Sequence, residues 1–388
     1  MAIPISYNIR NALQRPVSTL TTAAGIGLTV TIFIGALALA AGFQAALRET
    51  GSRDNAVVMR KGADSEISSF VSRAAASIVR AHPAVATAGD GRPLASAEMV
   101  VVTNKPRLGQ PGSSNVMVRG VDPEVFRLRD EIEIIDGRMF ELGTDQVIVG
   151  KRIAPRFAGC AIGEKVAFGP RQFTVVGHFT AGGSAFESEI WGDNEVLQPA
   201  LNRNGYQTLT FRMRDAAALA DLKKELEADP RLQVEVQRES EFFSNQSELL
   251  SNLIRFLGVF ITAIMAVGAI FGAMNTMYAA VQSRTREIAV LMVLGFSPFA
   301  VMTSFVIESV VVALIGGVLG CLLALPINGI VTSTTNFTSF SEVAFAFRIT
   351  PVALAAGLSF SLVMGLVGGL LPAFRAARQT PATSLRAL

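Results

Sequence analysis

The residue types that bind nucleotides, bind metals or act as nucleophiles do not form a recognised pattern in this sequence. It contains no GxxxxGK[ST] phosphate loop and no HExxH, CxxC or GxSxG motif. Two histidines, His82 and His178, are too few for a multi-histidine metal site, and two cysteines, Cys160 and Cys321, make no disulfide framework. We therefore expect a chain that is not an enzyme, with no catalytic residues, no cofactor-binding residues and no metal ligands.

Residues 281–298 lie between two long apolar runs and open with the charged residues Arg284, Arg286 and Glu287. This segment reads VQSRTREIAVLMVLGFSP, and its apolar block at 288–294 is too short to cross a bilayer. Gly295 is typical of a helix C-terminus, and Ser297 followed by Pro298 is typical of the start of the next helix. The pattern predicts a short helix at a membrane surface, with a basic end and an apolar side; a tight turn is the alternative.

The stretch MNTMYAAVQSRTREIAVLMVLGFSP resembles the signature of FtsX-like, or MacB-like, ABC transporter permeases of the type VII group. In that family the segment is a coupling helix that contacts the ATPase. The resemblance implies that ATP and Mg are bound by a partner ATPase. Where many relatives carry Arg shortly before the Leu-Gly pair, this chain has Met292. The residues to which the coupling role carries over are Arg284, Arg286, Glu287, Ile288, Leu291, Leu294 and Gly295.

The composition indicates a membrane protein with one polar domain. Of the 388 residues 50% are hydrophobic, and the mean hydropathy of +0.43 is high for a soluble protein. The apolar residues gather in four runs, at 17–43, 253–280, 299–325 and 351–374, each long enough to span a bilayer. The first run exceeds the ~7–15 apolar residues of a signal peptide, so we expect an uncleaved span, with a cleaved signal as the alternative. A net charge of +3 is small for a chain of this length and does not indicate binding to nucleic acid.

Residues 44–251 have the character of a folded polar domain. Strands are expected at 56–59, 98–103, 116–121, 146–149, 165–168 and 173–179, and helices at 65–80 and 216–228. Residues 206–239 read strand, helix, strand, and residues 241–252 are expected to extend the second span as a stalk. The segments VIVGKRIAPRF and IGEKVAFGPRQFTVVGHF resemble the β-rich insertion of MacB-like external domains, and the flanking pieces resemble a porter-type subdomain. The expected fold is an α-helical membrane protein with four transmembrane helices and a large extracytoplasmic α+β domain.

Two features of the apolar runs predict contacts between helices. Pairs of glycines four residues apart let helix backbones approach closely. The pairs are Gly268 and Gly272, Gly316 and Gly320, and Gly365 and Gly369. Glu308 is an ionisable residue within the third run, where a charge costs about 2.5–3.5 kcal/mol, and it matches a Glu that recurs in the family. We expect a polar anchor tied to the coupling helix or the second span; the alternative is a protonated or interface-exposed residue without a role.

Charge predicts the topology, because basic residues favour the cytoplasmic side of a membrane. The arginines gather before the first run, in the short helix and in the C-terminal tail, at Arg10, Arg15, Arg284, Arg286, Arg375, Arg378 and Arg386. The loop at 332–350 carries one charge of each sign, Glu342 and Arg348. We therefore expect both termini in the cytoplasm, the large domain outside, and a multi-pass protein of the cell inner membrane.

Three parts are expected: a cytoplasmic segment and first transmembrane helix at 1–43, a MacB-like domain with stalk ends at 44–251, and an FtsX-like domain at 252–388. The expected function is a permease subunit that couples ATP hydrolysis on a separate ATPase to extracytoplasmic movement or export of a substrate by mechanotransmission. Its expected partners are a cytoplasmic ATPase dimer, a second permease copy or a paralogue, and membrane lipids, with a periplasmic adaptor as a further candidate. The alternatives are an FtsX-like regulator of a cell-wall hydrolase and a ligand-sensing receptor.

Overall fold

The computed structural model describes residues 16–109 and 111–379, so Arg10, Arg15 and Arg386 of the topology argument lie outside the described residues. The chain divides into two compact units. Of the described residues, the helical unit comprises 16–41, 252–330 and 347–379. The sheet unit comprises residues 42–251 and 331–346. Residues 331–346 thus belong with the polar domain and not, as expected from the sequence, with the part at 252–388.

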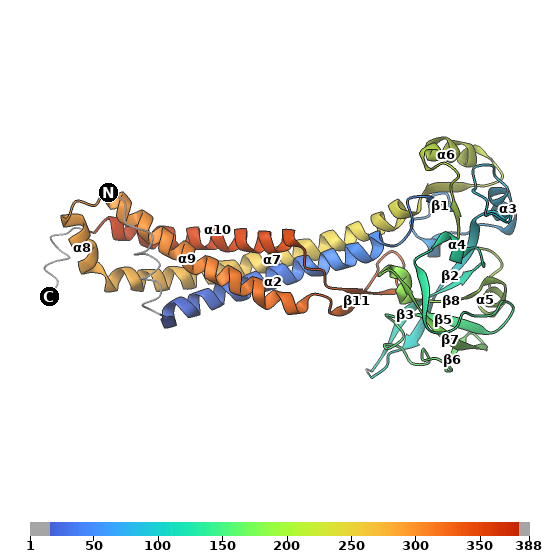
Figure 1. Ribbon diagram of the computed structural model, residues 1–388, viewed down its shortest axis with the longest axis horizontal. Helices are drawn as coiled ribbons and strands as arrows, with labels where there is room; N and C mark the ends of the chain where they lie inside the picture. The colour runs from blue at the N-terminus through green and yellow to red at the C-terminus, as the bar shows by residue number, and fades with distance from the viewer. Residues whose placement is uncertain (1–15, 110, 380–388) are drawn as a thin grey trace. The chain divides into compact units, whose positions relative to one another are not determined.

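The long helices match the four predicted apolar runs. The helices are α2 (Pro16–Arg48), α7 (Glu239–Ser283), α8 (Thr285–Val293), α9 (Pro298–Ala324), the 3-10 helix η4 (Leu325–Ile327) and α10 (Pro351–Ala377). Four of them, with η4 continuing α9, are long and apolar enough to cross a membrane, and α9 and α10 lie side by side (Figure 1). Because α7 begins at Glu239, the predicted stalk at 241–252 is helical.

Glycines set how closely the helices of the helical unit approach. A Cβ at Gly320 would lie 2.6 Å from the backbone oxygen of Gly27 in α2, and a Cβ at Gly316 would lie 2.7 Å from that of Ala23. On α10, a Cβ at Gly365 would lie 2.5 Å from the Cβ of Ala313 in α9. Two of the predicted glycine pairs are therefore contact points between helices, because a side chain would not fit there.

The pair on α7 differs, since a Cβ at Gly268 or Gly272 would meet no atom within 4 Å. Of the four long helices, α7 is the least buried within this chain. The prediction that this pair lies in a helix contact therefore stays a prediction, and it needs a partner other than this chain.

The contrast between these glycines gives a stability prediction. Gly320→Ala is expected to destabilise the helical unit by about 1–3 kcal/mol, because the new methyl group would overlap the backbone of α2. Gly25→Ala on α2, its matched control, is expected to be neutral or stabilising by up to about 1 kcal/mol, since alanine favours a helix and a Cβ there would meet no atom within 4 Å. Thermal unfolding of the two variants in detergent would compare them. Equal midpoints would contradict the packing described here.

The sheet unit is built on one mixed sheet. Its strands are β1 (Asn55–Arg60), β2 (Ala95–Pro106), β3 (Ser113–Val121), β4 (Ile132–Gly137), β5 (Gln146–Gly150), β6 (Lys165–Phe168), β7 (Arg171–Ala181), β8 (Glu189–Asp193), β9 (Thr208–Arg212) and β10 (Val234–Arg238). Their order is β10-β1-β9-β2-β3-β8-β5-β7-β4, with β6 also paired to β7. The predicted strand, helix, strand of residues 206–239 is β9, α6 and β10, with β1 inserted between the two strands.

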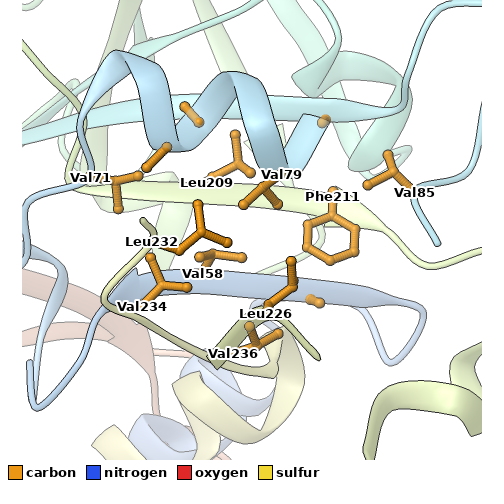
Figure 2. Close-up of a cluster of buried hydrophobic side chains, with 14 of the residues drawn as sticks. Val58, Val71, Val79, Val85, Leu209, Phe211, Leu226, Leu232, Val234 and Val236 are labelled. Carbon is orange, nitrogen blue, oxygen red and sulfur yellow. The ribbon is translucent and has the colours of Figure 1, made fainter. Parts of the chain in front are cut away.

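Two hydrophobic cores lie on this sheet. The first gathers side chains of β1, β9 and β10 with those of α3 (Arg73–Arg80) and α6 (Leu219–Ala228). Figure 2 shows Val79, Phe211, Leu226 and their neighbours converging there. The second core joins β3, β5, β6, β7 and β8 to α5 (Asn194–Ala200). The remaining short helices are α4 (Val125–Leu128), η1 (Glu66–Ser68), η2 (Ala185–Ser188) and η3 (Ala216–Ala218).

The predicted helix at 65–80 is wrong in its first half. Residues 66–68 form only a turn of 3-10 helix, and Val71 then forms an isolated bridge with Tyr206. The Ser72 side chain accepts a hydrogen bond from the Ala75 backbone N–H, which starts α3 at Arg73. Ser65 also has extended backbone but precedes only the 3-10 turn, and the chain is extended again at Ser69, so the α-helix begins after Ser72.

A hairpin of β11 (Val331–Thr335) and β12 (Glu342–Ala346) completes the sheet unit. The buried carboxylate of Glu342 pairs with Arg107 and lies 2.9 Å from Arg156, and Arg152 donates to the carbonyl oxygen of Ala344 at 2.9 Å. These contacts with three arginines explain why the segment groups with residues 42–251 and not with the helices on either side of it.

Candidate functional site

The short helix α8 begins and ends close to where the sequence predicts. At its C-terminus Gly295 has a positive φ of 93°, and the N–H groups of Gly295 and Phe296 donate to the carbonyl oxygens of Met292 and Leu291. This pattern is a Schellman motif, which favours glycine because a side chain is strained at that backbone angle. Ser297 then caps α9 by accepting a hydrogen bond from Ala300 N–H at 3.2 Å. The C-terminus of α8 and the start of α9 are therefore fixed by local sequence.

One face of α8 packs into the helical unit. Ile288 and Ala289 are buried, and Ile288 belongs to a cluster with Met277, Val281, Val301, Phe305, Ala373 and Ala376 of α7, α9 and α10. Met292, the residue at the position where many relatives carry Arg, packs against the same cluster. The inward face of α8 is thus apolar and is occupied by this chain.

The other face of α8 is open. Val293 and Leu294 are each 66% exposed, and Val290 is 48% exposed. Arg286 and Glu287 are exposed on the first turn. Apolar side chains beside exposed charges at a helix end are typical of a surface that binds another protein.

A buried ion pair joins the start of α8 to α9. The Arg284 guanidinium donates to the Glu308 carboxylate at 3.0 Å, and both residues are 6% exposed. Arg284 occupies the N-cap position of α8, and Glu308 lies within the predicted third span. A charge in such a place is costly unless it is paired, so each group stabilises the buried state of the other.

Two small cavities adjoin this pair. One, of about 30 Å³, is lined by Glu308 and by hydroxyl groups including Thr22, Thr276 and Ser309. The other, of about 10 Å³, lies between α8 and α9 and is lined by Arg284, Glu287, Ile288, Leu291 and Glu308. Volumes of this size hold about one or two water molecules each, so they fit solvation of the pair rather than a larger ligand.

The predicted coupling residues therefore separate into two groups. Arg284, Glu287, Ile288 and Leu291 line the contact between α8 and α9, together with Glu308, although Glu287 is also exposed. Arg286, Leu294 and Gly295 are exposed. The expectation that Ile288 contacts another protein has to be corrected, because its side chain is only 2% exposed and is already packed inside this chain.

Sequence reasoning missed a buried ionic network in the sheet unit. Arg119 on β3 pairs with Glu66, Glu98 and Glu189, and Arg129 pairs with Glu98 and Glu239. All six side chains are buried. The alternation of β2, with Ala97 and Met99 facing the cores, turns Glu98 to the opposite face of the sheet. That alternation was the available signal, but an acid within a strand usually indicates an exposed face.

Glu239, the first residue of α7, is the point where this network meets the long helix. Its carboxylate accepts hydrogen bonds from Arg129 at 2.8 Å, from the Ser52 backbone N–H at 2.9 Å and from the Asn55 side chain at 2.9 Å. The base of α7 is therefore held by the loop after α2 and by the sheet.

The electrostatics of the network follow from burial and pairing. Burial raises the pKa of Glu98, against the attraction of Arg129 and Arg119. Burial also opposes the charged form of Arg119, but the carboxylates of Glu189, Glu66 and Glu98 outweigh it and raise the pKa of that guanidinium. The charged form of each arginine is thus stabilised by several carboxylates, and the charged forms of the carboxylates are stabilised by the arginines. Within residues 16–109 and 111–379, the His, Cys, Asp and Glu side chains form no group of three that could hold a metal ion.

Comparison with known proteins adds two family matches. The family model of the MacB-like periplasmic core domain matches residues 19–229, and that of the FtsX-like permease C-terminal matches residues 259–381. The chain is 29% identical over 289 residues to the macrolide export ATP-binding/permease protein MacB of Pasteurella multocida (strain Pm70), covering 70% of this chain and 43% of that protein. It is 27% identical over 290 residues to the pyoverdine export ATP-binding/permease protein PvdT of Pseudomonas fluorescens (strain Pf0-1), covering 68% of this chain and 41% of that protein.

The chain therefore spans less than half the length of these relatives. Among solved structures, the periplasmic region of MacB from Actinobacillus actinomycetemcomitans aligns with 52% of this chain and 96% of its own, with a TM-score of 0.38 and 11% identity. The match to the MacB-like core domain covers more than half of the 388 residues, and the FtsX-like match covers the α7–α10 part that contains α8. The chain belongs to the FtsX-like, MacB-like family of ABC transporter permeases.

Proposed function

We propose that this chain couples ATP hydrolysis on an ABC ATPase to the extracytoplasmic movement or export of a substrate by mechanotransmission. The observation that carries the proposal is the two-sided α8. Its inner face is packed against α7, α9 and α10, while Arg286, Val293 and Leu294 remain exposed. A displacement of α8 by a partner bound to its exposed face would be transmitted to α7, α9 and α10 through its packed face.

The path outward in this proposal is α7. It runs without interruption from Glu239 to Ser283 and contains no proline. Because an α-helix without proline keeps its hydrogen-bond ladder, it can transmit an axial displacement. In this proposal the ATPase displaces α8, the displacement passes along α7, and the hydrogen bonds of Glu239 transmit it to the sheet unit.

The orientation and partners complete the proposal. Both termini lie in the cytoplasm, with Arg375 and Arg378 near the inner surface of the cell inner membrane, and the sheet unit lies outside. ATP and Mg are bound by the ATPase, of which two copies act together. A second permease copy packs on the open face of α7 that carries Gly268 and Gly272, and a periplasmic adaptor is a further candidate partner.

The test is a coupling assay. The chain is purified in detergent together with its ATPase, and ATP turnover and substrate movement are measured for wild type and for Arg286→Ala combined with Leu294→Asp. The expected result is loss of ATPase binding or of coupled turnover by tenfold or more, because a charge replaces one of the two most exposed apolar side chains of the α8 segment.

The matched control is Gln282→Ala, which changes an exposed residue just before α8 and is expected to have no effect. If no ATPase co-purifies and the double change is silent, the proposed coupling role of α8 is wrong.

A further inference from the structure

An open groove of about 590 Å³ lies where the end of α2 and the start of α7 come together in the sheet unit. It is lined by Arg48, Arg53, Arg238, Ser240, Glu241 and Ser244. Three guanidinium groups and two hydroxyls therefore face one space that contains a single carboxylate. The coupling function described above uses none of these residues.

The arginines of the groove have few acidic partners. Arg238 donates to the backbone oxygen of Ala216 at 3.1 Å and to that of Arg53, and lies 3.5 Å from the exposed carboxylate of Glu241. Arg48 and Arg53 are exposed and, among the residues that the structure describes, pair with no carboxylate. The lining therefore carries an excess of positive charge in a concave surface, which concentrates anions.

The donors suit an oxyanion rather than a halide or an apolar ligand. A guanidinium presents a planar set of N–H donors that matches phosphate or carboxylate oxygens in pairs. Ser240 and Ser244 add hydroxyl donors on the first turns of α7. The 45-residue helix α7 also places the positive end of its dipole at this groove.

The position of the groove along the two helices favours an amphiphile. Arg48 is the last residue of α2, five residues beyond the predicted apolar run, which corresponds to about 7.5 Å along a helix. On α7, exposed apolar side chains begin at Leu249, which is 67% exposed and lies five residues after Ser244. An anionic head group held in the groove would thus have an apolar surface within the reach of its chains.

We propose that this groove binds the phosphate-bearing head group of an anionic membrane lipid. Arg48 and Arg53 supply the two free guanidinium groups, Arg238 and the serine hydroxyls supply further donors, and the lipid chains extend along α7 from Leu249. The site is independent of the coupling role of α8, so failure of one leaves the other standing.

The test is lipid binding by the purified full chain in a non-ionic detergent, read by native mass spectrometry. Phosphatidylglycerol is titrated against wild type, Arg53→Gln, and Arg48→Gln combined with Arg53→Gln. Each arginine near a membrane surface contributes about 1 kcal/mol to anionic lipid binding. The apparent affinity is therefore expected to fall about fivefold in Arg53→Gln and about 25-fold in the double variant. The matched control is Arg203→Gln, which removes an exposed arginine elsewhere in the sheet unit and is expected to leave the affinity unchanged.

Three outcomes would overturn the proposal. Equal binding of phosphatidylcholine and phosphatidylglycerol to wild type would show that the head-group charge is not recognised. An equal loss of affinity in Arg203→Gln would show that only net charge matters. Displacement of the lipid by an equal concentration of inorganic phosphate would show that the groove takes a soluble anion instead.

Discussion

Replacing Arg119 with methionine is expected to lower the free energy of unfolding of the sheet unit by about 3–5 kcal/mol, because it leaves three buried carboxylates without their shared cation. Methionine keeps much of the side-chain length, so the loss reports charge more than volume. Trp191 is the single tryptophan of the chain, is fully buried and donates to Glu189 at 2.7 Å. Its fluorescence during thermal unfolding of the full chain in detergent therefore reports on the network directly.

Two further variants make this result specific. Arg127→Met removes an exposed arginine that pairs with Asp90 in the same unit, and it is expected to leave the midpoint nearly unchanged. Adding Glu66→Gln to Arg119→Met is expected to restore part of the stability, since Glu66, unlike Glu98, pairs with Arg119 alone among the described residues. If Arg119→Met unfolds at the wild-type midpoint, the network does not stabilise the sheet unit.

Features that depend on local sequence were predicted well. The four spans follow from the length of their apolar runs, and the ends of α8 and α9 follow from Gly295 and from Ser297 with Pro298. The six predicted strands all lie within observed strands, because alternation and turn residues mark them locally. These elements need no knowledge of what lies next to them in space.

Features that depend on distant partners were not predicted. The strand β8, EIWGD, was not predicted; all its residues are buried, and Glu189 can be buried there because it pairs with Arg119 on β3. The β11–β12 hairpin likewise joins the sheet unit through partners far away in the sequence, among them Arg107 and Arg156, which pair with Glu342. A carboxylate in a strand indicates an exposed face unless its cation is known, and that cation lies tens of residues away.

The candidate site shows the same division. The sequence identified both Arg284 and Glu308 and expected Glu308 to contact the coupling helix or the second span, while their pairing depends on how the chain turns between α7 and α8. Because residues 288–294 are all apolar, their sequence does not predict which side chains face inward. Only the structure assigns Ile288 to the interior and Leu294 to the surface.

Breaking the Arg284–Glu308 pair from either side is expected to destabilise the helical unit by about 3–5 kcal/mol, because each single change removes the oppositely charged partner of a buried charge. Arg284→Met combined with Glu308→Met removes both charges and is expected to cost much less than the sum of the two single changes. The readout is the rate at which a maleimide labels Cys321 of α9 in a Cys160→Ala background, since both cysteines are free thiols and the labelling follows opening of the helices.

Arg286→Met is the matched control for this cycle, because it removes an exposed arginine two residues away on the same helix. Its labelling rate should equal that of wild type, although the coupling proposal expects it to weaken ATPase binding. Additive effects of the two single changes would mean that Arg284 and Glu308 do not stabilise each other. A strong interaction between them, with a neutral Arg286→Met, would instead separate the residues that hold α8 in place from those that face its partner.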